Sequence, residues 1–213
     1  MKKYLLLLLV LALSFTTAFA ADENTIIIKT SKPVGTTVSL DAYTASKDEA
    51  FTVDWGDGEE KTYNVDPDGW GYSRRINTEI KGGTITIKGK LVNFDLTEAG
   101  ITSVDLHGQT ALKVINLKEN EIATFKQDGM PALTELNLRD NKLTTFSGTG
   151  MTSLNKLNLR GNQLDSYEFD ITDASATLTE LNVSDNGDKF INLNLMPFTA
   201  LEYFYCDNNP EFT

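Results

Sequence analysis

Side chains that commonly carry out catalysis are scarce in this chain of 213 residues. It contains one histidine, His107, and one cysteine, Cys206. A Ser-His-Asp or Cys-His mechanism would therefore depend on His107 alone, and a multi-histidine metal site or a disulfide framework cannot be built. No motif surrounds His107, so we expect a surface residue. Composition thus argues against an enzyme, and no cofactor is expected.

Carboxylates, by contrast, are abundant, with 30 acidic against 19 basic residues and a formal net charge of −11. Such a surface repels polyanions, so nucleic acid is not an expected partner. Paired carboxylates can cleave glycosides, but turns and solubility explain the acids here. An alternative role for some of these acids is a Ca²⁺ site formed by Asp54, Asp57, Asp66 and Asp68. Their spacing does not match a calcium-binding loop, and Asp in glycine-rich turns usually binds its own backbone, so no metal is predicted.

The first twenty residues have the pattern of a secretory signal peptide. A basic start at Lys2 and Lys3 precedes an apolar run from Leu5 to Leu13, and Ala18-Phe19-Ala20 offers small residues for cleavage. The run is shorter than the ~20 residues of a spanning helix, and no cysteine follows it to carry a lipid. We predict residues 1–20 to be removed near Ala20, giving a secreted or cell-surface protein without a membrane span. A retained N-terminal anchor is the alternative.

The second half of the chain repeats a leucine pattern about every 21 residues. It reads LKVINLKENEI from Leu112, LTELNLRDNKL from Leu133, LNKLNLRGNQL from Leu154 and LTELNVSDN from Leu178. Degenerate copies at Leu91 and Leu201 bring the number to about six. Apolar positions 4 and 6 alternate with polar positions 3, 5 and 7, which predicts a short strand with one buried side. One copy cannot bury that side alone, so the copies must stack as a parallel sheet.

The pattern L-x-x-L-x-L-x-x-N-x-L resembles the leucine-rich repeat across residues 91–213. The resemblance implies a solenoid with a parallel sheet on its concave face. The asparagines of the pattern should satisfy backbone groups at the turn after each strand. They are Asn120, Asn141, Asn162, Asn186 and Asn209.

The remaining residues of each copy should form the convex side as short 3₁₀ turns or extended chain. A second apolar column is predicted there from Val104, Phe125, Phe146 and Tyr167. The longer third copy carries extra residues between Asp165 and Ala176, which should bulge from this side. Cys206 is interpreted as a small hydrophobic residue in the column of position 6.

Residues 21–90 lack the repeat and are predicted to form a small antiparallel β-sandwich, which would cap the first repeat. Turn signals separate six β-branched or aromatic runs. These runs are Thr25–Thr30, Thr36–Leu40, Ala50–Trp55, Lys61–Val65, Arg74–Ile80 and Thr84–Lys88. The segment from Val53 to Gly58, VDWGDG, resembles the W-x-F-G-D-G strand-turn of PKD-type modules, without its first Trp and its Phe. A WGDG-bearing β domain before asparagine-rich repeats is similar to secreted, internalin-like bacterial proteins, which implies adhesion.

Outward positions 3, 5 and 7 of the copies define the candidate binding surface. The predicted contact residues are bases at position 7, amides at position 5 and the tyrosines of the last copy. They are Lys118, Arg139, Arg160, Asn116, Asn137, Asn158, Tyr203 and Tyr205. The alternative is that the bases only form solvated ion pairs with the neighbouring acids of position 8, and that the tyrosines pack beneath further sequence.

We therefore expect a binding module with a protein ligand, and a glycan is a possible second ligand. Aromatic residues are typical of binding hot spots, which favours the tyrosine-bearing surface for protein contact. The alternative function is carbohydrate binding by aromatic residues of the N-terminal β domain. These residues are Trp55, Tyr63, Trp70 and Tyr72.

Overall fold

A computed structural model of the chain describes residues 24–68, 71–127 and 129–213. The predicted signal peptide, residues 1–20, lies outside these described residues. The described chain is rich in strands, and its only helices are two 3₁₀ turns, η1 (Ser166–Glu168) and η2 (Thr172–Ala174). In the described ranges no helix has the length and apolar character needed to cross a membrane.

Seven strands come before the repeats, one more than the sequence predicts. They are β1 (Thr25–Thr30), β2 (Thr37–Thr44), β3 (Ala50–Asp54), β4 (Glu60–Asn64), β5 (Asp66–Asp68), β6 (Gly71–Glu79) and β7 (Thr84–Lys88). The short strand β5 was not expected, and β2 runs four residues beyond its predicted end at Leu40 because Asp41 to Thr44 pair with both β6 and β8.

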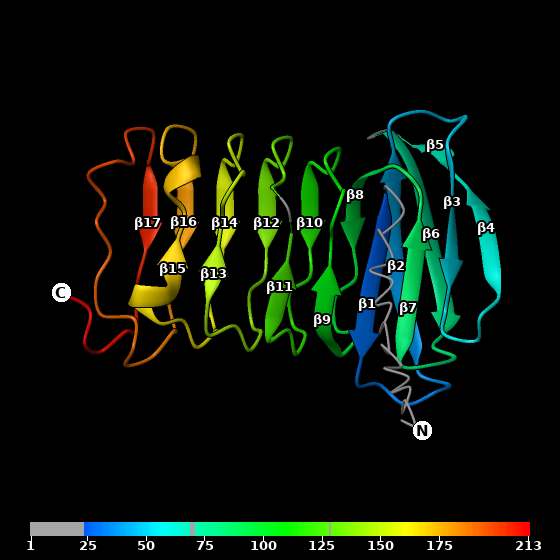
Figure 1. The fold of residues 1–213 in the computed structure, drawn as a ribbon, viewed down its shortest axis with the longest axis horizontal. Coiled ribbons are helices and arrows are strands. Elements are labelled where there is room, and N and C mark those ends of the chain that lie inside the picture. The colour runs from blue at the N-terminus through cyan, green and yellow to red at the C-terminus, as the bar shows by residue number, and fades with distance from the viewer. Residues whose placement is uncertain (1–23, 69–70, 128) are drawn as a thin grey trace, which may run out of the picture.

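The repeats contribute the remaining strands in two alternating sets. The first set carries the leucine pattern: β8 (Leu91–Asp95), β10 (Val114–Asn116), β12 (Glu135–Asn137), β14 (Lys156–Asn158), β16 (Glu180–Asn182) and β17 (Tyr203–Tyr205). The second set lies on the other side: β9 (Ile101–Asp105), β11 (Thr124–Lys126), β13 (Phe146–Ser147) and β15 (Phe169–Asp170). Figure 1 shows the two sets as layers along the long axis, which confirms the solenoid with its parallel sheet.

Both layers continue into the N-terminal strands. The nine-stranded sheet has the order β17-β16-β14-β12-β10-β8-β2-β6-β5, and the six-stranded sheet has the order β11-β9-β1-β7-β3-β4. Pairing is parallel among the repeats and antiparallel where β8 meets β2 and where β9 meets β1. Hydrogen-bonded sheets therefore cross the predicted boundary between residues 90 and 91, and the division into a separate sandwich and solenoid stays a prediction.

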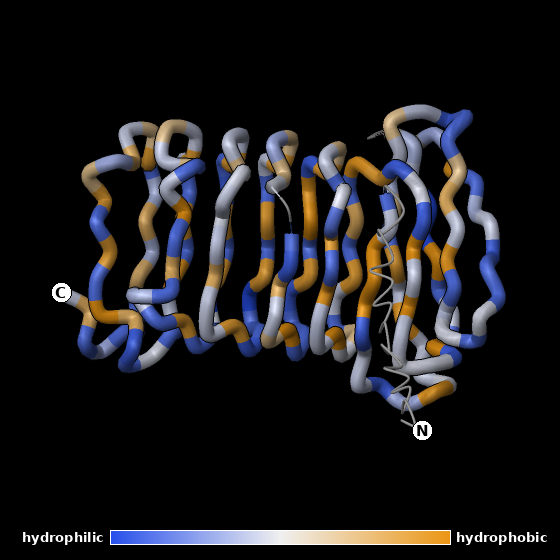
Figure 2. The backbone as a smooth tube through the Cα atoms, viewed as in Figure 1, coloured by the Kyte–Doolittle hydropathy of each residue, from blue (hydrophilic) through white to orange (hydrophobic). Residues whose placement is uncertain are grey.

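The core lies between the layers and consists of the predicted apolar columns. Positions 1, 4 and 6 are buried in the first five copies, as Leu133, Leu136 and Leu138 illustrate. Hydrophobic and hydrophilic residues alternate along these strands (Figure 2). In the last copy the corresponding residues, Phe204 and Cys206 among them, are only partly buried. Burial and the neighbouring carboxylate of Asp207 raise the pKa of the Cys206 thiol, which disfavours a reactive thiolate.

The asparagines form the same hydrogen bonds from copy to copy, which confirms their predicted role at the turns. Each of the five side chains is buried. In Asn141, Oδ1 accepts a hydrogen bond from the Ile122 backbone N–H at 2.9 Å. Its Nδ2 donates to the carbonyls of Leu117 and Leu138, both at 2.9 Å. Each amide thus joins its own turn to the preceding copy.

The residue before each asparagine adopts a left-handed backbone, which sequence reasoning did not predict. All six copies share a positive φ, between 54° and 69°. These residues are Glu98, which precedes Ala99 in the first copy, and Glu119, Asp140, Gly161, Asp185 and Asn208, which precede the five asparagines. The signal was the Asp, Asn or Gly found at this position in four of the six copies, since these residues tolerate positive φ best.

On the opposite side, the predicted apolar column is wrong at Tyr167. This side chain lies in η1 and is 80 % exposed. Phe169 takes its place, because β15 pairs with β13 in a register that sets Phe169 beside Phe146. Their ring centroids are 6.1 Å apart, and the row of rings continues through Phe190. The extra residues of the copy that begins at Leu154 shift the column by two positions while η1 and η2 bulge outward.

Gln109 is a polar member of an otherwise apolar column. Met130 and Met151 occupy the same place in the next two copies, and all three residues are buried. Neither Nε2 nor Oε1 of Gln109 has a hydrogen-bond partner among the residues that the structure describes. An unpaired buried amide lowers stability because folding removes its hydrogen bonds to water.

Replacing Gln109 by methionine, the residue at the equivalent position of the next two copies, should stabilise the fold. We expect Gln109→Met to raise the free energy of unfolding by about 1–3 kcal/mol, measured by urea denaturation. Gln127→Met is the matched control, since Gln127 is only half-buried and its Nε2 donates to the Ser147 and Thr149 carbonyls. A loss of stability in Gln109→Met would show that this amide does find partners.

Candidate functional site

The outer face of the nine-stranded sheet presents two registered rows of side chains. Strand register places Tyr43, Asn93, Val114, Glu135, Lys156, Glu180 and Tyr203 side by side in the first row. The second row holds Arg75, Asp41, Asp95, Asn116, Asn137, Asn158, Asn182 and Tyr205. Residues from β2 and β6 therefore extend the face that the repeats begin.

A groove of about 670 Å³ lies along these rows. It runs from Asp41 and Arg75 on the N-terminal strands, across β8, β10, β12 and β14, to Glu180 on β16. The predicted contact residues Asn116, Asn137 and Asn158 line it. Lys118, Arg139 and Arg160 do not, because position 7 lies beyond the strand ends. Sequence reasoning missed Asp41, Tyr43 and Arg75, since the pairing of β2 with β8 joins segments about fifty residues apart.

The amides of the second row share one orientation. In Asn137 and Asn158, Oδ1 accepts the backbone N–H of the residue two positions later, at 3.1 Å in both. Asn182 forms the same contact with Ser184 at 3.0 Å. Their Nδ2 groups have no acceptor within the described parts of the chain. The row therefore presents a ladder of amide donors to any ligand that enters the groove.

Two carboxylates face each other at the N-terminal end of the groove. Asp41 and Asp95 are directly opposed in the antiparallel pair of β2 and β8. Arg75 binds both oxygens of Asp41, each at 2.7 Å. Asp95 accepts hydrogen bonds from Asn116 Nδ2 at 2.7 Å and Thr97 Oγ1 at 2.8 Å. Asp95 thus has neutral donors only, although it lies next to another carboxylate.

The basic residues of position 7 are paired with acids outside the groove. Lys118 Nζ lies 3.8 Å from Glu119, Arg139 Nε lies 2.8 Å from Asp140, and Arg160 Nε lies 2.7 Å from Asp185. A hydrogen bond from the Asn208 amide and the pair with Arg160 lower the pKa of Asp185. The three bases remain about two-fifths exposed, so the pairs are solvated and individually weak.

The tyrosines of the last copy lie in the same rows but beyond the groove. Tyr203 is 55 % exposed and Tyr205 is 41 % exposed. The structure therefore brings the predicted contact residues onto one face, with the amides in the groove, the bases along one rim and the tyrosines at the C-terminal end. Whether the bases and tyrosines contact a ligand stays a prediction.

Comparison with known proteins agrees with this stacked architecture. Residues 110–164 match a family model described as Leucine rich repeat, and residues 174–187 match a second model of the same description. These two segments therefore carry leucine-rich repeats. A search of curated proteins and a search of solved structures gave no match. Leucine-rich repeats are typically binding modules without enzymatic activity, and they generally mediate protein-protein interaction.

Two of the four aromatic residues predicted to bind a glycan are buried in the described structure. Trp55 and Tyr63 are buried, and the indole Nε1 donates to the Tyr63 hydroxyl at 3.1 Å. Tyr72 packs against the core and is only partly exposed, while Trp70 lies outside the described residues. The predicted use of Trp55 and Tyr63 for stacking on a glycan is therefore wrong, because both rings fill the core.

The acidic turns in this part of the chain are explained by internal contacts. Asp54 Oδ1 accepts backbone hydrogen bonds from Gly56, Asp57 and Gly58 at 2.8–3.1 Å. Lys81 pairs with Asp57 and lowers its pKa, and Arg74 pairs with Asp66. In the described ranges no three His, Cys, Asp or Glu side chains are grouped to hold a metal ion.

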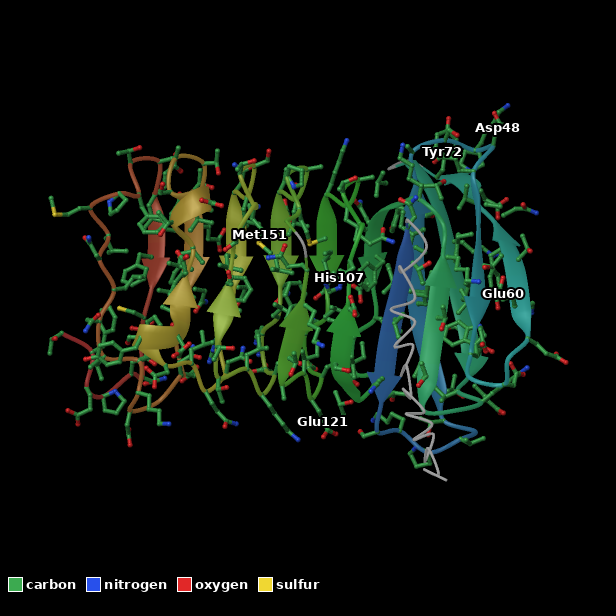
Figure 3. The ribbon with its side chains drawn as sticks, in the orientation of Figure 1. Asp48, Glu60, Tyr72, His107, Glu121 and Met151 are labelled. Atoms are coloured by element: carbon green, nitrogen blue, oxygen red, sulfur yellow. The ribbon has the colours of Figure 1, made fainter. Side chains whose placement is uncertain are left out.

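His107 follows β9 on the side of the leucine-rich repeats that carries the six-stranded sheet (Figure 3). Its side chain is 40 % exposed, and Nδ1 contacts the Asp105 carboxylate. Burial acts to raise the pKa of Asp105, but hydrogen bonds from the His107 side chain and backbone outweigh it, so the pKa lies below its usual value. This pair lies on the other layer from the groove.

Proposed function

We propose that the chain is a secreted or cell-surface module that binds a protein through the groove of its nine-stranded sheet. The observation that carries this proposal is the ladder of Nδ2 donors at Asn137 and Asn158, held in place by backbone hydrogen bonds in a groove of about 670 Å³. Preorganised donors reduce the entropic cost of binding. The signal-peptide pattern supports secretion, and the internalin-like resemblance supports a role in adhesion.

The position of the groove on a stacked sheet supports a protein ligand. Each strand that lines the groove is bonded to two neighbours, so the groove floor is rigid, and it extends over five strands of the repeats. An extended surface of this kind is typical of how solenoid proteins bind macromolecules. Lys118, Arg139, Arg160, Tyr203 and Tyr205 adjoin the groove and form the outer part of the proposed contact surface.

Site-specific photo-crosslinking tests this proposal. A photoreactive residue replaces Asn137 in the groove or, as control, Thr124 on the exposed face of β11 in the other sheet. Each variant of the full chain is exposed to a mixture of candidate extracellular proteins. We expect the yield of crosslinked adducts to be at least severalfold higher with the photoreactive residue at position 137 than at position 124. Equal labelling at both positions, or preferential labelling at 124, would contradict the proposal.

A further inference from the structure

The opposed carboxylates in the groove point to a cationic ligand group. Like charges directly across an antiparallel pair destabilise a sheet, yet Asp41 and Asp95 occupy such positions. Among the described residues that line the groove, Arg75 is the cation at this pair. It is bound to both oxygens of Asp41 and acts on Asp95 only through space, whereas the hydrogen bonds to Asp95 come from neutral Asn116 and Thr97. A second cation above this pair would relieve the repulsion.

The charge balance of the whole groove also favours a cationic ligand. Its lining contains four carboxylates, at Asp41, Asp95, Glu135 and Glu180, but only two bases, Arg75 and Lys156. Lys156 lies 3.8 Å from Glu135, whereas Glu180 forms no ion pair within the described parts of the chain. The groove therefore attracts basic segments and repels acidic ones. The bases of position 7 are paired with acids outside the groove and do not offset this charge.

The amide ladder starts at Asn137, two strands from Asp95, and offers donors at a fixed spacing. Neighbouring strands lie about 4.8 Å apart, so Asn158 on β14 is roughly 14 Å from Asp95 on β8. An extended polypeptide advances about 3.3 Å per residue, so about four residues span this distance. Backbone carbonyls are suitable acceptors for the Nδ2 groups of Asn137 and Asn158, and a peptide can therefore bind the ladder through its main chain.

We infer that the groove binds an extended polypeptide segment bearing a lysine or arginine, with the basic group at Asp41 and Asp95 and the following backbone carbonyls on Asn137 and Asn158. The inference rests on the proposed function and adds the chemistry of the partner. It also makes the N-terminal strands part of the binding site, because β2 supplies Asp41 and β6 supplies the arginine that holds it.

Selection from a library of linear peptides tests this inference on the full chain. We expect the selected peptides to be enriched in Lys and Arg and depleted in Asp and Glu. The double variant Asp41→Asn/Asp95→Asn should weaken the binding of a selected peptide about tenfold or more, since hydrogen bonds to charged groups are among the strongest. Asp140→Asn/Asp185→Asn is the matched control, because it changes the net charge equally but outside the groove.

The outcomes separate this inference from the proposed function. A loss of affinity in the groove variant alone, with thermal midpoints of both variants close to that of the parent chain, supports a basic segment. Equal losses of affinity in both variants would overturn the inference. Selection of acidic peptides whose binding is abolished by Asn137→Trp would also overturn it, while leaving the groove as a binding site. Selected peptides that are insensitive to Asn137→Trp would contradict the proposed function itself.

Discussion

Asn141→Ala should lower the free energy of unfolding by about 3 kcal/mol, because truncation leaves the buried Ile122 N–H without an acceptor and removes the three hydrogen bonds that Nδ2 donates to backbone carbonyls. The Leu117 carbonyl still accepts a hydrogen bond from Asn120 Nδ2, and the Leu138 carbonyl still accepts one from Asn162 Nδ2. The orphaned N–H therefore accounts for the larger part of the loss. Urea denaturation followed by circular dichroism measures the effect.

Asn137→Ala is the matched control for this substitution. Asn137 lies in the same copy, but its side chain faces the groove and accepts a single hydrogen bond, from the Arg139 N–H. We expect a loss of about 1 kcal/mol or less, as for most surface changes. Similar losses in both variants would mean that the buried amide column is not a principal source of stability.

Gly56→Ala should destabilise the fold by about 3 kcal/mol or more, because backbone occupies the space that a side chain needs. Gly56 has a φ of +109°, and a Cβ there would lie 2.5 Å from both Cα and N of Gly82. The close approach is fixed by hydrogen bonds from the Lys81 and Gly82 N–H groups to the Trp55 carbonyl, at 2.9 and 3.2 Å. Overpacking against backbone and the cost of positive φ act together.

Gly58→Ala separates these two causes. Gly58 lies in the same turn with a φ of +83°, but a Cβ at this position meets no atom within 4 Å. We therefore expect a loss of about 1 kcal/mol, which is the cost of the left-handed backbone alone. Thermal denaturation of the two variants gives the comparison. If Gly56→Ala proved no worse than Gly58→Ala, the contact with Gly82 would be adjustable rather than restrictive.

In the column of aromatic rings, the repeat pattern predicts the contacts of the regular copies but not those of the longer one. Regular spacing places Phe125 and Phe146 correctly, because each copy advances the stack by one strand. In the longer copy that begins at Leu154 the spacing is not regular, and extending the pattern from the earlier copies predicted Tyr167. Strand pairing of β13 with β15 selected Phe169 instead, since a shift of two residues keeps an apolar side chain on the buried side.

The sequence by itself determined the solenoid, its buried leucine columns and the asparagine column, because a fixed repeat length makes equivalent residues stack and gives each the same surroundings. Only the tertiary structure decided the binding surface. Asp41 and Arg75 reach the groove because β2 pairs with β8 and with β6, and this pairing depends on contacts between segments that no local pattern connects. For the same reason only the tertiary structure decided the charge of the groove: the bases of position 7 are held by acids at the rim, whereas carboxylates from two distant segments meet on the groove floor.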